Sequence, residues 1–459
     1  MKPGVGGDQR QRRGGPAPRP PDHVFLLLIS PLFILSFTWA IGLIGYEVGG
    51  LIGQNYSYFA FMVYALKLVP QSTPFGYLWL LLGYLFFATG VVAAGVWNRR
   101  QPPDYSNVRS FFFFKVLLIL FSVTSVVAFM WIGVAIIQFG GLAAIMEVAA
   151  SDNVAARDAI VGAAFPGGRL VSSGFIGIAV LCAGRLALTE VPMTFPQRLA
   201  IVGMFIVALI YLSLAPILIS GRINFFIACI GSFVAASIVR GRIIGVGYLL
   251  IGVGMLAFVW TIKQYFVMGH VTDESVAQQG WQSILFYLYN DVYNALVPVQ
   301  NNEGDLALGW YSLRFVFFLT FTNKWFQAYN AEAIIDAQEW MGGGEIPLLG
   351  APYIDFGFGG LIVLLVMGYA TQIVFMKCRR HFFYASAYGL IFACLLLSTH
   401  SAYLTSQEVA YNLIVIGAVG WLVTRRAPQA RPAVRSVFPN PRDRSLVPGG
   451  PVAGQSSSL

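Results

Sequence analysis

Residues 217–228 read ILISGRINFFIA, in which a single arginine, Arg222, separates two long apolar runs. The surrounding segment 199–239 holds 41 residues and no other charge. As a helix it would extend roughly 62 Å at 1.5 Å per residue. The hydrocarbon core of a bilayer is about 30 Å thick, so this length predicts two membrane crossings. Pro216 and Gly221 provide the breaker and the flexible residue for a tight reversal between them.

The rest of the chain repeats this pattern. Of its 459 residues 57% are hydrophobic and 11% are charged, whereas ordinary soluble proteins carry about 25% charged residues. The out-in alternation of a membrane barrel is missing. We therefore expect an all-α polytopic membrane protein with about ten transmembrane helices. The expected spans are 23–44, 75–97, 111–137, 169–187, 199–219, 223–239, 243–262, 354–375, 382–402 and 408–424.

The segments outside the spans complete the predicted organisation. Residues 1–22 and 425–459 are rich in Pro, Gly, Arg and Ser and are expected to be disordered basic cytoplasmic tails. Seven helices cover 23–262, a large helical extracytoplasmic loop covers 263–353, and three helices cover 354–424. Three shorter apolar stretches are expected to lie on or dip into the outer surface, and one of them is a candidate for a further crossing: 56–70, 283–299 and 311–322.

Charge tests the proposed orientation. With both termini in the cytoplasm, the inner side holds 22 of the 29 basic and 5 of the 20 acidic residues, a net charge of +17. The outer side then holds 7 basic and 15 acidic residues, a net charge of −8. The positive-inside rule predicts this asymmetry. The basic excess therefore indicates orientation in the membrane and gives no reason to expect a nucleic-acid partner.

The outer side is where function is expected, because the inner loops are short. The loops 138–168 and 263–353 are long, and the second is rich in Trp, Tyr, Asn, Asp and Glu. Aromatic faces with directed polar groups suit carbohydrate, although the same aromatics also gather at any membrane surface. The four cysteines lie inside or beside apolar runs without metal spacing. Neither a metal nor another cofactor is expected.

The few outer cations are candidate ligands for an anion. Arg169, Arg222, Lys263 and Arg314 fall near one membrane depth, where they could converge on a diphosphate. The alternative for Arg222 is snorkelling to lipid phosphates. Further along, 349–375 reads LGAPYIDFGFGGLIVLLVMGYATQIVF. Its Asp355 is expected to accept hydrogen bonds from amides at a helix start, and the glycines after it are expected to permit close helix approach.

At this point the chain resembles the O-antigen polymerase family, the bacterial oligosaccharide repeat-unit polymerases. The turn SGRINFFIACIGSF, 220–233, is similar to the turn where such proteins place Gly/Ser-Arg between two spans. The stretch YIDFGFGGLIVLLVMGY, 353–369, looks like the family's Tyr-x-Asp-Phe-Gly-x-x-Gly motif at the start of a span. The general plan of 23–424 resembles the family, whereas motif-level similarity is confined to 217–240 and 349–372.

The resemblance implies a metal-independent membrane glycosyltransferase of the bacterial plasma membrane. Such an enzyme joins polyprenyl-diphosphate-linked oligosaccharide repeats into a surface polysaccharide (O-antigen, capsule or exopolysaccharide). The growing chain passes from its lipid diphosphate to a sugar hydroxyl of the next unit. A chain-length regulator and a flippase of the same pathway would be partners, besides the lipid bilayer.

The resemblance also assigns roles to individual residues. Arg222, Tyr353 and Asp355 become catalytic candidates, with Arg222 on the diphosphate. Gly357 and Gly360 become substrate-binding candidates. Arg169, Lys263 and Arg314 join them from charge alone, and Asn224, next to the Arg222 turn, is a further substrate-binding candidate. The general base stays open among Asp305, Asp336, Asp355 and His270.

Two other functions compete with the polymerase. A polysaccharide ligase of the same superfamily would use a histidine in the late loop, and neither His270 nor His400 lies in a matching motif. A flippase or transporter of lipid-linked oligosaccharide would favour ionisable residues in mid-span and repeat symmetry. No repeat is visible in the sequence, and the basic residue Lys115 lies close enough to a span end to snorkel.

Overall fold

The structure is a computed structural model. It describes residues 23–69, 71–95, 105, 108, 110–141, 143–144, 167–219, 222–245, 247, 254, 275–302 and 304–425. Within these residues the chain forms helices and no strand. The helices are α1 (His23–Leu28), α2 (Pro31–Ile52), η1 (Gly53–Asn55), α3 (Ser57–Ala65), α4 (Pro74–Ala93), α5 (Ser110–Gln138), α8 (Gly168–Ser172), α9 (Phe175–Ala187), α10 (Phe195–Ile219), α11 (Arg222–Arg240), α13 (Val276–Asn301), α14 (Arg314–Leu319), α15 (Asn323–Tyr329), α16 (Ala331–Glu339), α17 (Ala351–Phe356), η2 (Gly357–Gly359), α18 (Gly360–Lys377), α19 (Phe382–Leu396), η3 (Tyr403–Thr405) and α20 (Gln407–Arg425).

The predicted fold class is confirmed: the chain is an all-α, multi-pass membrane protein. Among the described residues, eight helical segments are long and apolar enough to cross a bilayer. They correspond to eight of the ten expected spans, and α19 is a shorter apolar helix at the ninth position. The expected span 243–262 lies almost wholly outside the described residues, as do the tails and 263–274.

Two expected spans have different ends in the structure. The first is broken at Ile29–Ser30, where the Ser30 hydroxyl caps α2 by accepting from the Phe33 amide at 3.3 Å and Pro31 begins the helix. The ninth, predicted as 382–402, ends as a helix at Leu396. Residues 397–400 form a turn after it and are followed by η3. This early ending places a polar segment at the end of the helix.

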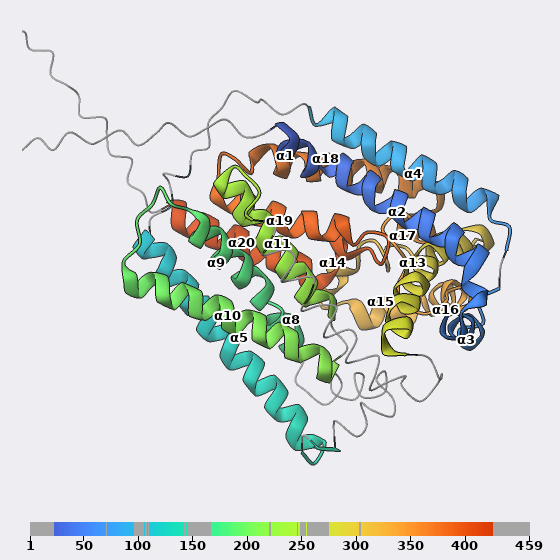
Figure 1. Cartoon of the computed structure of the whole chain (residues 1–459), viewed down its shortest axis with the longest axis horizontal. Helices are drawn as coiled ribbons and strands as arrows, with labels where there is room; N and C mark the ends of the chain where they lie inside the picture. The colour runs from blue at the N-terminus through green and yellow to red at the C-terminus, as the bar shows by residue number, and fades with distance from the viewer. Residues whose placement is uncertain are drawn as a thin grey trace, which may run out of the picture.

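The centre of the bundle is α19, which is buried along most of its length. It packs against α2, α9, α11, α18 and α20. In Figure 1, α9, α11, α19 and α20 lie together, with α5 and α10 on one side and α2, α4 and α13 on the other. Gly231 of α11 and Gly389 of α19 allow a close approach of these helices, because a Cβ on Gly389 would lie 2.4 Å from the Gly231 carbonyl oxygen.

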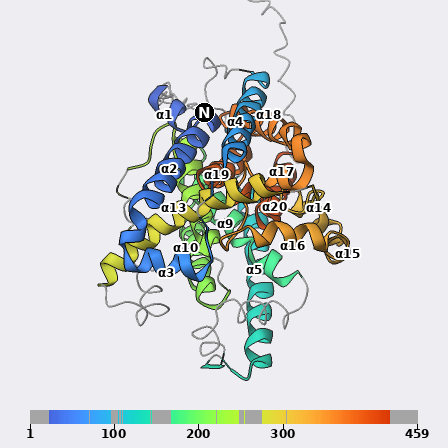
Figure 2. The ribbon, with the colours of Figure 1, turned by 90° about the vertical axis from the view of Figure 1, so that its right-hand side faces the viewer.

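The stretch 283–299 is largely enclosed by other helices of the bundle, with Ile284 exposed. It is the middle of α13, where residues 289–299 are buried, and Figure 2 shows α13 crossing the direction of α2. Glycines on one face of α2 permit this crossing. A Cβ on Gly45 would lie 2.6 Å from the Leu288 Cβ, and one on Gly49 would lie 3.0 Å from the Tyr289 Cβ. The other two short apolar stretches, 56–70 and 311–322, contain α3 and α14 respectively.

Exposed apolar side chains mark the lipid-facing surface. They cover outward faces of α5, with Ile119, Phe129 and Ile137, and of α10, with Ile210 and Leu214. A soluble monomer rarely exposes so large an apolar area, whereas a bilayer solvates it. The apolar helices therefore fit a lipid environment.

Candidate functional site

The motif at 353–360 forms the junction between α17 and α18. Gly357 ends α17 with a φ of +57°, a backbone conformation that disfavours other residues. Gly360 begins α18 so close to the preceding turn that a Cβ would lie 2.2 Å from the Pro352 carbonyl oxygen. The two glycines therefore shape the backbone of the junction itself. Gly360 makes its close contact with Pro352 of the preceding helix α17.

Asp355 is fully buried and anchors a neighbouring segment. Its Oδ1 accepts from the Tyr311 amide at 3.1 Å, and its Oδ2 accepts from the amide of Ser312 at 2.5 Å and from the Ser312 hydroxyl. The amides come from the segment before α14 and not, as expected, from the start of its own helix. Backbone bonds from Ala307 and Leu308 to residues 354 and 355 complete the attachment. In this arrangement the carboxylate holds 307–312 against α17.

Tyr353 lies in an aromatic cluster beside that junction. Its ring centroid is 4.8 Å from that of Trp79, 5.4 Å from that of Phe75 and 6.2 Å from that of Phe358. The cluster ties the start of α4 to the α17–α18 junction. Such edge contacts stabilise packing, so Tyr353 is held as part of the helix interface.

Arg314 begins α14 with its guanidinium over aromatic rings. Its Cζ lies 5.1 Å from the Trp310 ring centroid and 5.9 Å from that of Phe318. The Nε atom is buried and has no hydrogen-bond partner among the described groups. Cation–π contact therefore orients this cation, which keeps hydrogen-bonding capacity for an acceptor.

Arg169 sits in α8 and forms an ion pair with the first turn of α20. Its Nη2 lies 3.2 Å from Glu408 Oε1, and the Arg169 side chain is 38% exposed. Asn412, one turn further along α20, donates to the Ser173 carbonyl at 3.0 Å and accepts from the Gly177 amide at 2.7 Å. Since α14 also contacts α20, the elements carrying Arg169 and Arg314 pack on the same helix.

Arg222 begins α11, but its side chain lies outside the described residues. Its level in the bundle follows from helix register. A Cβ on Gly231 would lie 3.2 Å from Val180 and 3.3 Å from the Gly389 carbonyl oxygen. Arg222 lies nine residues before Gly231 on α11. A step of nine residues in the same direction along the neighbouring helices leads from Val180 back to Val171 and from Gly389 forward to Ser398. At about 1.5 Å per residue, Arg222 therefore begins its helix at the end of the bundle that holds α8 and the turn after α19.

The remaining candidates are less informative. Asn224 lies half-buried in the first turn of α11. Lys263 and His270 lie outside the described residues. Asp305 and Asp336 are exposed. Within the described part of the chain, no group of three or more His, Cys, Asp or Glu side chains is placed to hold a metal ion.

A pair that the sequence did not single out lies at this end of the bundle. His400 Nδ1 is 2.7 Å from Asp291 Oδ1, although 109 residues separate them. Asp291 comes from the buried part of α13, and His400 comes from the turn that follows the early end of α19. An acid inside the apolar stretch 283–299 was the available signal, because ionisable residues in apolar segments are rare and often functional.

Hydrogen bonds fix both segments that carry the pair. The Leu348 amide donates to the Ser398 carbonyl at 2.9 Å, the Trp39 indole donates to the Ser398 hydroxyl at 3.1 Å, and the Ser401 hydroxyl donates to Glu345. On α13, Asn294 donates to the Gly343 carbonyl at 2.7 Å. These bonds tie both the turn and α13 to the segment 343–348.

The pair joins a buried carboxylate to a more exposed imidazole. Burial raises the pKa of Asp291, and the neighbouring His400 opposes this by favouring the carboxylate. The side chain of His400 is 28% exposed, whereas that of Asp291 is 10% exposed. A histidine oriented through Nδ1 by a buried carboxylate can accept a proton at its other ring nitrogen. The rings of Tyr287 and Tyr403, at 6.0 and 5.9 Å from the His400 ring, flank it.

Comparison of the chain with protein-family models, with curated proteins and with solved structures finds no match.

Proposed function

We propose that this protein is a membrane glycosyltransferase that lengthens lipid-linked oligosaccharide at the end of the bundle where α8 and α11 begin. The observation that supports this most is the His400–Asp291 pair, at 2.7 Å, on the same end as Arg169 and Arg222. An acid–base pair and cations are the two elements that glycosyl transfer from a diphosphate needs without a metal.

The proposed reaction transfers a saccharide chain from a polyprenyl diphosphate to a sugar hydroxyl. His400 accepts the proton of the acceptor hydroxyl at Nε2, while the Asp291 carboxylate, 2.7 Å from Nδ1, orients the imidazole. The hydroxyl oxygen forms a bond to the anomeric carbon as the bond from that carbon to the phosphate oxygen breaks. The diphosphate leaves with its developing charge balanced by Arg222, for which arginine offers bidentate contacts.

His400 is thus proposed as the general base, in place of the four residues among which the sequence left that role open. Asp355 accepts three hydrogen bonds and is fully buried, which favours a supporting role over proton transfer. Arg314, held over Trp310 with a buried Nε, is proposed to contact the saccharide or phosphate oxygens. The proposed setting is the outer face of a bacterial plasma membrane, with a flippase and a chain-length regulator as partners in the pathway.

The test is lengthening of lipid-diphosphate-linked repeat units by the purified protein, read as a ladder on a gel. We expect polymer from the wild type, a rate about 10²–10⁴-fold lower for His400→Gln, and a smaller loss for Asp291→Asn. Arg222→Ala should leave single repeats, and Arg222→Lys should rescue poorly because it lacks the planar fork. The matched control is His381→Gln, at the opposite end of α19, which should match the wild type.

Equal rates for His400→Gln and the wild type would contradict the assigned base. A wild-type protein that never lengthens the units but moves them across vesicle membranes would support the flippase instead. The His400–Asp291 pair would also suit the ligase alternative, which uses a histidine, although His400 lies outside the late loop where a ligase would place it. Transfer of one finished chain to a lipid acceptor without a diphosphate, with no ladder, would identify a ligase.

A further inference from the structure

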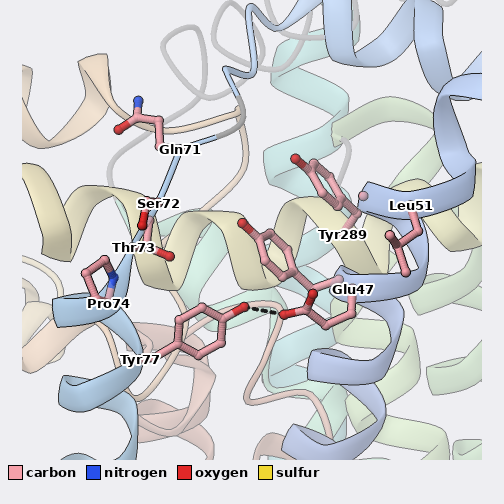
Figure 3. A pocket seen from close by; sticks show the side chains of 10 residues that line it. Glu47, Leu51, Gln71, Ser72, Thr73, Pro74, Tyr77 and Tyr289 are labelled. Atoms are coloured by element: carbon pink, nitrogen blue, oxygen red, sulfur yellow. Dashed lines mark hydrogen bonds between the residues drawn. The ribbon is translucent and has the colours of Figure 1, made fainter.

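A cavity of about 420 Å³ lies where α2, the segment before α4 and α13 meet, apart from the residues discussed so far. Figure 3 shows Glu47 of α2, Tyr77 of α4 and Tyr289 of α13 around it, with residues 71–74 forming one edge. Its size falls in the range of about 300–1,000 Å³ that is typical of small-molecule sites. The cavity is therefore large enough for a ligand.

The walls of the cavity combine flat aromatic surface with hydrogen-bonding groups. The rings of Tyr46 and Tyr289 stack with their centroids 5.0 Å apart and an interplanar angle of 11°. The Tyr77 hydroxyl donates to Glu47 Oε1 at 2.5 Å, and Figure 3 shows this bond at the cavity. Gln71, Ser72 and Thr73 add an amide and two hydroxyls along the edge. The polar groups thus lie beside the tyrosine rings that also line the cavity.

The cavity and the His400–Asp291 pair lie on different faces of the same helix. Tyr289 and Asp291 are two residues apart on α13, which turns their side chains by about 200° around the axis. A chain-like ligand that occupied both places would have to pass around α13. The cavity is therefore a separate subsite and not the place where proton transfer is proposed.

The charge of the cavity limits what it can bind. Glu47 is the one charged side chain among the described residues that line it. A carboxylate without a lining cation repels phosphates and carboxylates, so the cavity is unsuited to the diphosphate end of a lipid-linked substrate. An acyl chain would offer these polar groups no hydrogen bonds beyond those they already make, at a cost in free energy.

We propose that this cavity is a binding site for an uncharged saccharide ring. The apolar face of a pyranose would pack on the tyrosine rings, while its hydroxyls would bond to Glu47, Gln71 and Thr73. The natural ligand rests on the proposed function: it would be a sugar of the oligosaccharide that lies away from the reacting bond. Binding of a sugar ring to the cavity does not itself depend on that function.

The test measures binding without turnover. Methyl glycosides of glucose, galactose and N-acetylglucosamine are added to the protein in lipid nanodiscs, free of sugar-headed detergent, and saturation-transfer NMR gives the Kd. We expect at least one glycoside to bind, and Tyr46→Ala to raise its Kd about tenfold. Tyr46→Phe, which keeps the ring, should bind nearly as the wild type does. The control is Tyr329→Ala, a tyrosine that is 70% exposed on α15.

A comparison of a charged with an uncharged sugar tests the class of ligand. Glucose 1-phosphate should bind about tenfold more weakly than methyl glucoside to the wild type, and Glu47→Gln should reduce that difference. The inference is overturned if no glycoside binds, if Tyr46→Ala and Tyr329→Ala weaken binding equally, or if the phosphate binds as well as the glycoside. If the protein binds a glycoside but forms no polymer, the proposed function is contradicted while the proposal of a saccharide site is retained.

Discussion

At the scale of single residues, three carboxylates near α13 and α17 have different surroundings. Asp291 is paired with a half-exposed histidine, Glu345 accepts from Ser401, and Asp355 is enclosed by backbone and hydroxyl donors. A carboxylate whose lone pairs are all taken by fixed donors is stabilised in place, whereas one paired with an accessible imidazole can exchange a proton. The surroundings, more than the residue type, therefore separate a support from a catalytic candidate.

Replacement of Asp355 tests that distinction. Asp355→Asn keeps the shape of the side chain but replaces one accepting oxygen by an NH2 group that faces other donors, so the segment 307–312 should lose its anchor. We expect a loss of about 1.5–3 kcal/mol for each charge-assisted hydrogen bond that is broken, measured as a lower Tm in detergent. Asp336→Asn, at an exposed position, should leave the Tm unchanged.

The two possible roles of Asp355 predict different kinetics. If Asp355 is a support, the folded fraction of Asp355→Asn retains the wild-type rate per folded molecule. An unchanged Tm with a lost rate would instead return Asp355 to the catalytic group.

At the scale of elements, close approach between helices decides where the polar segments lie. The α2 face with Gly42, Gly45 and Gly49 receives α13 and the turn after α19, since a Cβ on Gly42 would lie 2.9 Å from Thr399 and 3.2 Å from Val292. In a bilayer, small residues allow backbones to approach closely and gain packing contacts. This face therefore sets the depth of Asp291 and His400 in the bundle.

A methyl group on that face should displace α13. Gly45→Ala would place a Cβ 2.6 Å from the Leu288 Cβ, and overpacking of this kind typically costs about 1–3 kcal/mol. We expect a lower Tm. We also expect a lower rate of polymer formation, because a displacement of α13 would change the distance between His400 and Asp291. The matched control is Gly133→Ala on α5, where no described atom beyond the helix's own nearby backbone lies within 4 Å of the added methyl group.

Gly133→Ala should be neutral or stabilising, by up to about 1 kcal/mol from helix propensity. If Gly45→Ala were as stable and active as Gly133→Ala, the α2 face would not be what positions α13.

At the scale of the whole molecule, the two ends of the bundle are expected to differ in charge. The inner side is expected to carry a net charge of +17 and the outer side −8, and this asymmetry predicts the orientation in the membrane. The candidate residues Arg169, Glu408, Asp291 and His400 all lie toward the end that is expected to be outside. The orientation thus decides on which side of the membrane a substrate can reach them.

Labelling tests that orientation. A cysteine replacing Trp325, which is 67% exposed in α15, should react with a membrane-impermeant maleimide in right-side-out vesicles. A cysteine replacing the exposed Glu190, between α9 and α10, should react only after the vesicles are opened. The four native cysteines are buried or half-buried and are replaced by serine or alanine as background. The reverse pattern of labelling would place the proposed site in the cytoplasm.

The sequence by itself determined the class of fold and most of the spans. Runs of about 20 apolar residues can satisfy their backbone groups in lipid only as helices, so length and composition suffice for α4, α5, α10 and α11. The motif at 353–360 was also visible locally, because a glycine with positive φ and a glycine without room for a Cβ leave a signature in the sequence.

Only the tertiary structure decided which polar groups meet. The His400–Asp291 pair depends on an early end of α19, on the glycine face of α2 and on a contact across 109 residues, none of which periodicity can reveal. The same holds for Asp355, whose donors come from a segment more than 40 residues earlier in the chain. Hydrophobicity is a local property of the chain and selects the environment of each segment, whereas hydrogen-bonded pairs are set by how the segments pack together.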